Sequence, residues 1–131
     1  MSTRRRPAAI ALVVWTFLVW TTRINNIWSD DALSDSDKWG RTALALSFTL
    51  LALAAAVALW RGAEWLSGVL LVLTGWTIGV WLTRSVGIAT GDHGAGFKVV
   101  HLVLAAVSIA LSAATIHEHR REASELPGAP L

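Results

Sequence analysis

Two stretches of nineteen residues without a single charged side chain, residues 42–60 and 65–83, constrain this chain more than any other feature. Residues 99–116 add a run of eighteen in which only His101 is ionisable, and residues 7–22 add a run of sixteen. A helix needs about 20 largely apolar residues to cross the hydrocarbon core of a bilayer. We therefore predict an all-α membrane protein with four transmembrane helices, at about residues 7–25, 41–60, 65–84 and 97–117.

A water-soluble four-helix bundle is the alternative, and the side chains of these runs argue against it. A helix of a soluble bundle carries a polar face that recurs at the helical period. Residues 42–60 contain only three polar side chains, those of Thr42, Ser47 and Thr49. One arginine at the centre of a span would cost about 3 kcal/mol on insertion, and no such residue is present. Insertion into a bilayer is therefore the favoured state.

The basic residues predict the orientation of the helices. Four spans place both termini on one side, which then holds six basic residues against five on the other: Arg4, Arg5, Arg6, Arg61, Arg120 and Arg121 against Arg23, Lys38, Arg41, Arg84 and Lys98. Positive residues favour the cytoplasmic side, and an arginine triplet precedes the first span. We therefore expect both termini in the cytoplasm, and we interpret the triplet as an orientation signal rather than a nucleic-acid contact. The chain is rich in Trp and Ala and free of Cys, which suggests the plasma (inner) membrane of a bacterium.

A nine-residue segment occurs twice. Residues 15–23 read WTFLVWTTR and residues 76–84 read WTIGVWLTR, with six identical positions at an offset of 61. After a gap of one residue the similarity continues at an offset of 60, which pairs Lys38 with Lys98, Arg41 with His101, Leu44 with Leu104, Ala45 with Ala105 and Leu51 with Leu111. We predict two tandem helical hairpins, residues 7–60 and 65–117, related by a pseudo-two-fold axis along the membrane normal. A tight inner loop, 61–64, joins them, between a cytoplasmic N-terminus, 1–6, and a cytoplasmic tail, 118–131, with a disordered end.

This layout of two tandem hairpins resembles the small bacterial SPW-repeat membrane proteins. The Ser-Pro-Trp tripeptide of that family does not occur here, and Trp28 next to Ser29 does not supply it. The resemblance concerns the architecture, and it transfers no functional residue to this chain.

The repeated segment places three side chain types on one stripe of each helix. Thr16, Trp20 and Arg23 follow the i, i+4, i+7 spacing of a helix face, and Thr77, Trp81 and Arg84 do the same. In one interpretation each stripe anchors its helix at the outer interface, with Trp at the headgroups and Arg extended toward phosphate. In the other, Arg23 and Arg84 line one outward-facing site for an anion or a lipid headgroup, together with Trp20 and Trp81. Two aspartates that are also 61 residues apart could then pair with the arginines: Asp31 and Asp92.

Three glycines predict a packing surface. Gly68, Gly75 and Gly79 share a face of the third span, opposite the Thr77 stripe, and this kind of spacing lets helices approach closely. The face could pack inside the bundle, or it could bind a second copy or another membrane subunit. Both alternatives remain open at this point.

Several kinds of chemistry lack their residues. There is no cysteine, which removes thiolate catalysis and Cys-ligated metals. The four histidines lie in or beside the last span, whereas a membrane haem needs ligands on facing helices; we interpret His101 as an interfacial histidine. The spans contain no Asp or Glu, which coupled transporters use inside the membrane. We predict no cofactor, no metal site and no catalytic residue.

The sequence therefore predicts a small multi-pass membrane protein without enzymatic activity. Its packing surfaces favour an accessory subunit or scaffold of a membrane complex, whose partners are the lipid bilayer and other membrane subunits or a second copy. The alternative is an outward-facing binder or carrier of an anion or lipid headgroup, using Arg23 and Arg84. No nucleic-acid partner is expected.

Overall fold

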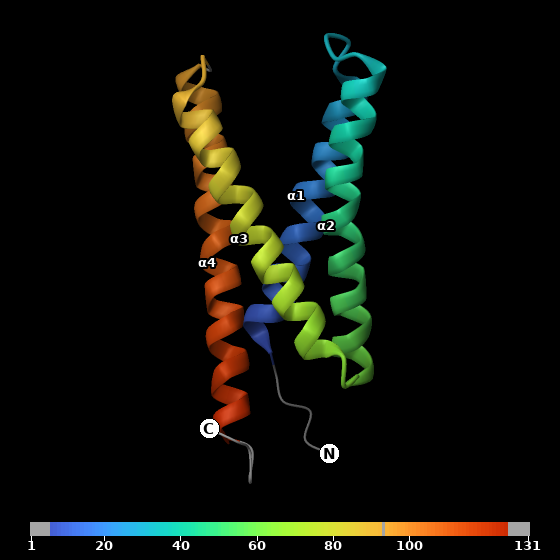
Figure 1. Ribbon diagram of the computed structural model, residues 1–131, viewed down its shortest axis with the longest axis vertical. Helices are drawn as coiled ribbons and strands as arrows, with labels where there is room; N and C mark the ends of the chain where they lie inside the picture. The colour runs from blue at the N-terminus through green and yellow to red at the C-terminus, as the bar shows by residue number, and fades with distance from the viewer. Residues whose placement is uncertain (1–5, 93, 126–131) are drawn as a thin grey trace.

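Four α-helices make up the fold: α1 (Pro7–Ser29), α2 (Asp35–Arg61), α3 (Leu66–Thr90) and α4 (Ala95–Glu125) (Figure 1). The computed structural model describes residues 6–92 and 94–125, with side chains to residue 122. The predictions made for four parts of the sequence concern residues outside this described part of the chain, namely Arg4, Arg5, His93 and the tail 126–131. All four helices are long and apolar enough to cross a membrane, which confirms the predicted all-α class with four spanning helices.

The helices are longer than the apolar runs that predicted them. At 1.5 Å per residue their 23 to 31 residues correspond to about 35–47 Å, whereas the hydrocarbon core is about 30 Å thick. A helix satisfies its own backbone hydrogen bonds, so it can continue where the chain leaves the lipid. As a result, the connection between α1 and α2 consists of residues 30–34 only, whereas the sequence predicted a longer connection at residues 26–40.

Local residues set the ends of α2. Ser34 precedes it, and its hydroxyl accepts a hydrogen bond from the backbone N–H of Asp37 at 3.2 Å. Asp35 and Asp37 lie in the first turn, where the helix dipole favours negative charge. At the other end Gly62 adopts φ 62°, the left-handed conformation that glycine allows without strain, and the chain turns into α3.

The two hairpins cross and then diverge. Figure 1 shows the hairpins close together toward the end where α1 begins and α4 ends, which we call the terminal end. They lie apart at the opposite end, where α1 and α3 end and α2 and α4 begin, which we call the loop end. α1 packs on α2 and α4, and α3 packs on α4 and α2. Exchanging the hairpins would preserve this set of contacts, which is compatible with the predicted pseudo-two-fold axis; the axis itself stays a prediction.

The side chains of the core become larger from the terminal end toward the loop end, where the hairpins are farther apart. Near the terminal end the core consists of small and aliphatic residues, among them Ala52, Ala55 and Ala58 of α2. Toward the loop end the core is aromatic, because larger side chains are needed to fill the wider space at protein density. Trp20 stacks on Phe48, with ring centroids 4.2 Å apart and planes 7° apart, and its centroid lies 5.8 Å from that of Trp81.

Two tryptophan side chains donate hydrogen bonds from one hairpin to the other. Trp15 Nε1 of α1 donates to Ser108 Oγ of α4, and Trp76 Nε1 of α3 donates to Ser47 Oγ of α2, both at 2.9 Å. The two tryptophans occupy equivalent positions of the predicted repeat. Each therefore bonds the second helix of the other hairpin, in an apolar setting where an interhelical hydrogen bond contributes about 0.6–2 kcal/mol.

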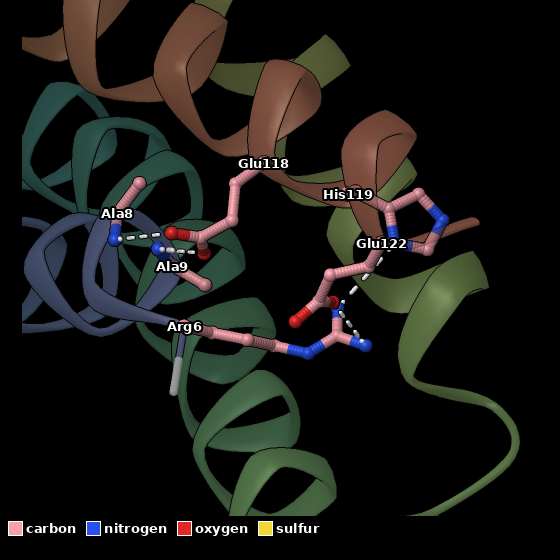
Figure 2. A network of polar contacts seen from close by, with 6 residues as sticks. All are labelled: Arg6, Ala8, Ala9, Glu118, His119 and Glu122. Atoms are coloured by element: carbon pink, nitrogen blue, oxygen red, sulfur yellow. Dashed lines mark hydrogen bonds and ion pairs between the residues drawn. The ribbon is translucent and has the colours of Figure 1, made fainter. Parts of the chain in front are cut away.

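Polar contacts also join the first and last helices at the terminal end (Figure 2). The Glu118 carboxylate of α4 accepts hydrogen bonds from the backbone N–H groups of Ala8 and Ala9, at 3.0 and 3.3 Å. These N–H groups belong to the first turn of α1, where they have no partner inside the helix. Arg6 Nη2 lies 2.7 Å from Glu122 Oε2, and its Nη1 lies 3.4 Å from His119 Nδ1. Glu118 thus caps α1 from another helix.

We predict that Glu118→Ala lowers the stability of the protein. The substitution leaves two N–H groups of α1 without an acceptor and removes a negative charge from the positive end of a helix, which costs roughly 1–3 kcal/mol. Thermal unfolding in detergent measures the effect. Glu64→Ala is the matched control, because it removes an exposed carboxylate at the same end of the bundle and should change stability by less than about 0.5 kcal/mol. Equal midpoints for the two variants would contradict the capping role.

Candidate functional site

A cavity of about 350 Å³ opens between α1, α3 and α4. Its size falls within the range of about 300–1,000 Å³ that is usual for small-molecule sites, and sites between helices are common in bundles. Polar side chains line one part and apolar side chains the rest. The polar ones are Thr22, Arg23, Asn26, Arg84 and His101; the apolar ones are Trp15, Leu18, Val19, Trp20, Trp81, Val100 and Leu104. The cavity therefore brings together both arginines and both tryptophans that the sequence proposed as a binding site.

The two arginines reach the cavity from equivalent positions on α1 and α3, and both are half-buried. Arg23 lies within electrostatic range of Arg84, and each of them lies within range of Arg41 on α2. In the part of the chain that the structure describes, neither Arg23 nor Arg84 forms a hydrogen bond or an ion pair. The Nε atom of Arg84 is enclosed and has no partner there. Like charges therefore meet in a half-buried place without a compensating anion from those residues.

The tryptophans of the repeat do not face the headgroups. Trp20 and Trp81 are each 3% exposed, and they lie in the centre of the bundle. The interpretation of these two residues as interfacial anchors is therefore wrong, because an anchor must present its ring to lipid. They form a wall of the cavity instead, three residues before the arginine on each helix. Five other tryptophans are exposed, namely Trp28, Trp39, Trp60, Trp65 and Trp76.

The aspartates proposed as partners of the arginines lie elsewhere. Asp31 is exposed in the short connection between α1 and α2, and Asp92 is exposed just after α3. Neither forms an ion pair with Arg23 or Arg84 within residues 6–92 and 94–125. The expected neutralisation of the arginine pair is therefore not made by these carboxylates.

His101 belongs to the site although the sequence interpretation assigned it only to the interface. Its Nδ1 lies 2.9 Å from the carbonyl oxygen of Phe97, and its ring stacks on the Phe97 ring at 3.9 Å. A carbonyl only accepts, so Nδ1 carries the hydrogen of this bond. The Nε2 atom remains available to a ligand. A sequence signal existed, because the gapped repeat equates His101 with Arg41.

The two halves differ in side-chain size at one pair of equated positions in the core. The predicted repeat equates Phe48 of α2 with Ser108 of α4 at the offset of 60. The Phe48 ring fills the space next to Trp20 and lies 6.0 Å from Trp76. Ser108 supplies only a hydroxyl, which Trp15 binds. Ser108 itself is buried and does not line the cavity, so the two halves fill the core differently at this pair of positions.

The glycine face of α3 points away from the other helices. Gly68, Gly75 and Gly79 are exposed, and a Cβ atom added at any of them would meet nothing within 4 Å. The helix packing expected at these glycines is therefore not made by residues 6–92 and 94–125. The inner face of α3 consists of other residues, namely Leu66, Leu70, Leu73, Thr74, Thr77, Trp81 and Ile88.

Known proteins offer no assignment for this site. Comparison of the chain with protein-family models, with curated proteins and with solved structures finds no match. The cavity is therefore interpreted from its own geometry and charge.

Proposed function

We propose that this protein binds an anionic group at Arg23 and Arg84, on the side of the membrane opposite its termini. The observation that carries the proposal is the convergence of two half-buried arginines on one cavity without a counter-charge among the described residues. With both termini in the cytoplasm, as the basic residues predict, the loop end and its cavity face the outside.

The chemistry of the two side chains supports an oxyanion as the ligand. A guanidinium presents five N–H donors in a planar fork, which matches the oxygens of a phosphate or carboxylate. The partly apolar surroundings strengthen such hydrogen bonds, because the local dielectric constant is lower than that of water. An anion between the arginines would also remove their mutual repulsion. Binding thus relieves an unfavourable feature of the ligand-free protein.

The depth of the site agrees with this role. Arg23 lies six residues before the end of α1, which corresponds to about 9 Å of helix. Arg6, at the other end of α1, lies seventeen residues away, or about 26 Å along the axis. The hydrocarbon core is about 30 Å thick, so Arg23 falls close to the boundary between lipid tails and headgroups. An anion could reach this level without crossing the membrane.

We predict that Arg23→Met and Arg84→Met each stabilise the ligand-free protein while abolishing anion binding. Removing one of two uncompensated like charges should raise the free energy of unfolding by about 0.5–2 kcal/mol, as at other functional sites that strain the fold. The measurement is thermal unfolding in a detergent free of phospholipid, with and without inorganic phosphate. Phosphate should raise the midpoint of the wild type and leave that of the variants unchanged.

Arg120→Met is the control for this experiment, because it removes an exposed arginine at the terminal end. It should retain the phosphate effect and differ from the wild type by less than about 0.5 kcal/mol. A loss of ligand-free stability in both cavity variants would show that the arginines have a structural role, and would count against the proposal.

A second role, as an accessory subunit or scaffold, is favoured by the open glycine face of α3. Gly75 and Gly79 leave a shallow surface that no part of the described chain covers. Exposed Leu71 and Val72 border it and could pack against a partner helix. In lipid, where helices associate by close packing rather than by a hydrophobic driving force, such a surface suits a second copy or another membrane subunit.

We predict that Gly75→Leu together with Gly79→Leu abolishes association through α3 and leaves the fold intact. The new side chains meet no atom of the same chain, yet they keep a partner helix from approaching closely. Crosslinking in the membrane, or energy transfer between labelled copies, measures association. Ala11→Leu, at an exposed position of α1, is the control and should leave association unchanged. Recovery of the wild type as a lone monomer after crosslinking would argue against this second role.

A further inference from the structure

The polarity of the cavity changes along the membrane normal. On α1, Arg23 and Asn26 line the part nearer the loop end, and Trp15 and Leu18 line the deeper part. Eight residues separate Arg23 from Trp15, which corresponds to about 12 Å of helix. α4 runs in the opposite direction, and it places His101 nearer the loop end and Leu104 one turn deeper. The cavity is thus polar near the loop end and apolar closer to the middle of the membrane. A lipid in that leaflet has the same order, with its headgroup outside and its acyl chains inside.

The cavity also opens sideways. Leu18 of α1 and Val100 of α4 both line it, yet they are 60% and 55% exposed on the surface of the bundle. For a chain that spans a membrane, this apolar surface at that depth contacts lipid tails. A ligand can therefore enter between α1 and α4 from within the bilayer, a path that suits an amphiphile better than a free ion.

The volume limits how much of a lipid the cavity holds. About 350 Å³ equals the liquid volume of roughly a dozen water molecules. This space accommodates a phosphate group and the first carbons of a chain, but no complete lipid. The remaining acyl carbons would stay in the bilayer, outside the gap between Leu18 and Val100.

His101 adds a criterion for the headgroup. Its Nδ1 is engaged by the Phe97 carbonyl, so only Nε2 faces a ligand as donor or acceptor. A phosphomonoester suits both states of this atom, because its P–OH group donates to a neutral Nε2 and its oxygens accept from a protonated one. A phosphodiester has no P–OH group and can only accept. The monoester also carries up to two negative charges at neutral pH, so its charge balances that of the two arginines more closely than the single charge of a phosphodiester does.

We propose that the occupant of the cavity is a lipid with a phosphomonoester headgroup, whose phosphate lies among Arg23, Arg84 and His101 and whose acyl chain leaves between Leu18 and Val100. This inference rests on the proposed anion site, and it identifies the class of ligand and its source. His101 acts as a specificity residue, whereas the two arginines supply the attraction that any oxyanion would experience.

The test uses the full chain in phosphatidylcholine nanodiscs that contain phosphatidate, phosphatidylglycerol or neither, with lipid retention read by native mass spectrometry. Phosphatidate should be retained about tenfold or more over phosphatidylglycerol, as expected for an added hydrogen bond to a charged group. His101→Ala should lower this preference several-fold while retaining both lipids, and the preference that remains should reflect the larger negative charge of the phosphomonoester beside the arginines. The double variant Arg23→Met, Arg84→Met should retain neither.

A second pair of variants separates a lipid from a free ion. Val100→Trp should narrow the lateral opening and reduce phosphatidate retention by about tenfold or more, while the stabilisation by inorganic phosphate in detergent persists. Val99→Trp is the matched control, because Val99 is also an exposed valine of α4 and does not line the cavity. The Val99→Trp variant should bind phosphatidate and inorganic phosphate as the wild type does.

The outcomes distinguish the two proposals. Stabilisation by inorganic phosphate without phosphatidate retention, or retention unaffected by Val100→Trp, would overturn the lipid inference and leave the anion site standing. Equal retention of phosphatidate and phosphatidylglycerol by the wild type would overturn the monoester assignment. Failure to bind either phosphate or anionic lipid would overturn both proposals.

Discussion

A bilayer interior offers no hydrogen-bond partner to a backbone and no solvation to a charge, and the organisation of this chain depends on that constraint. Each long apolar segment becomes a helix, because only a helix satisfies its own N–H and C=O groups. The remaining polar requirements are met between helices. Trp15 and Trp76 donate to serines of the other hairpin, and Glu118 accepts from the first turn of α1. The first and last helices are thereby joined at the terminal end.

The cavity follows from the way the hairpins fill the space that opens between them. Small residues let the helices approach near the terminal end, and Trp20, Phe48 and Trp81 fill the wider part above it. The filling is unequal, because Phe48 occupies one side and Ser108 stands at the equated position on the other. An internal repeat that was fully symmetric would close or open both sides alike. The cavity is likewise unequal between the halves, because it is lined by α1 of the first hairpin and by both helices of the second.

The arginine pair is costly in isolation, and the anion site that we propose rests on this cost. Arginines that only anchored a helix would extend to headgroups or pair with nearby carboxylates. Here Arg23 and Arg84 converge, and the aspartates that could neutralise them lie exposed at the connections. A protein can keep such an arrangement when a ligand supplies the missing charge. Stability and binding are then opposed at these two positions, as they often are at functional sites.

The sequence by itself determined the number and order of the spanning helices, because charges and apolar runs are separated along the chain and the bilayer tolerates only that pattern. It also equated Arg23 with Arg84 and Trp20 with Trp81, since tryptophan and arginine at one spacing are rare in apolar segments. It could not determine which face of each helix points inward. In lipid both faces are apolar, so hydropathy does not distinguish the buried Trp81 stripe from the exposed glycine face.

Only the tertiary structure decided those orientations. It turned Trp20 and Trp81 into the core, left Gly75 and Gly79 on the surface and brought His101 beside the arginines. The physical reason is that packing between helices depends on the complementary shapes of several chain segments at once. The cavity is formed by residues that come from α1, α3 and α4 together. No single segment contains that information, and the cavity therefore becomes visible only after the four helices are assembled.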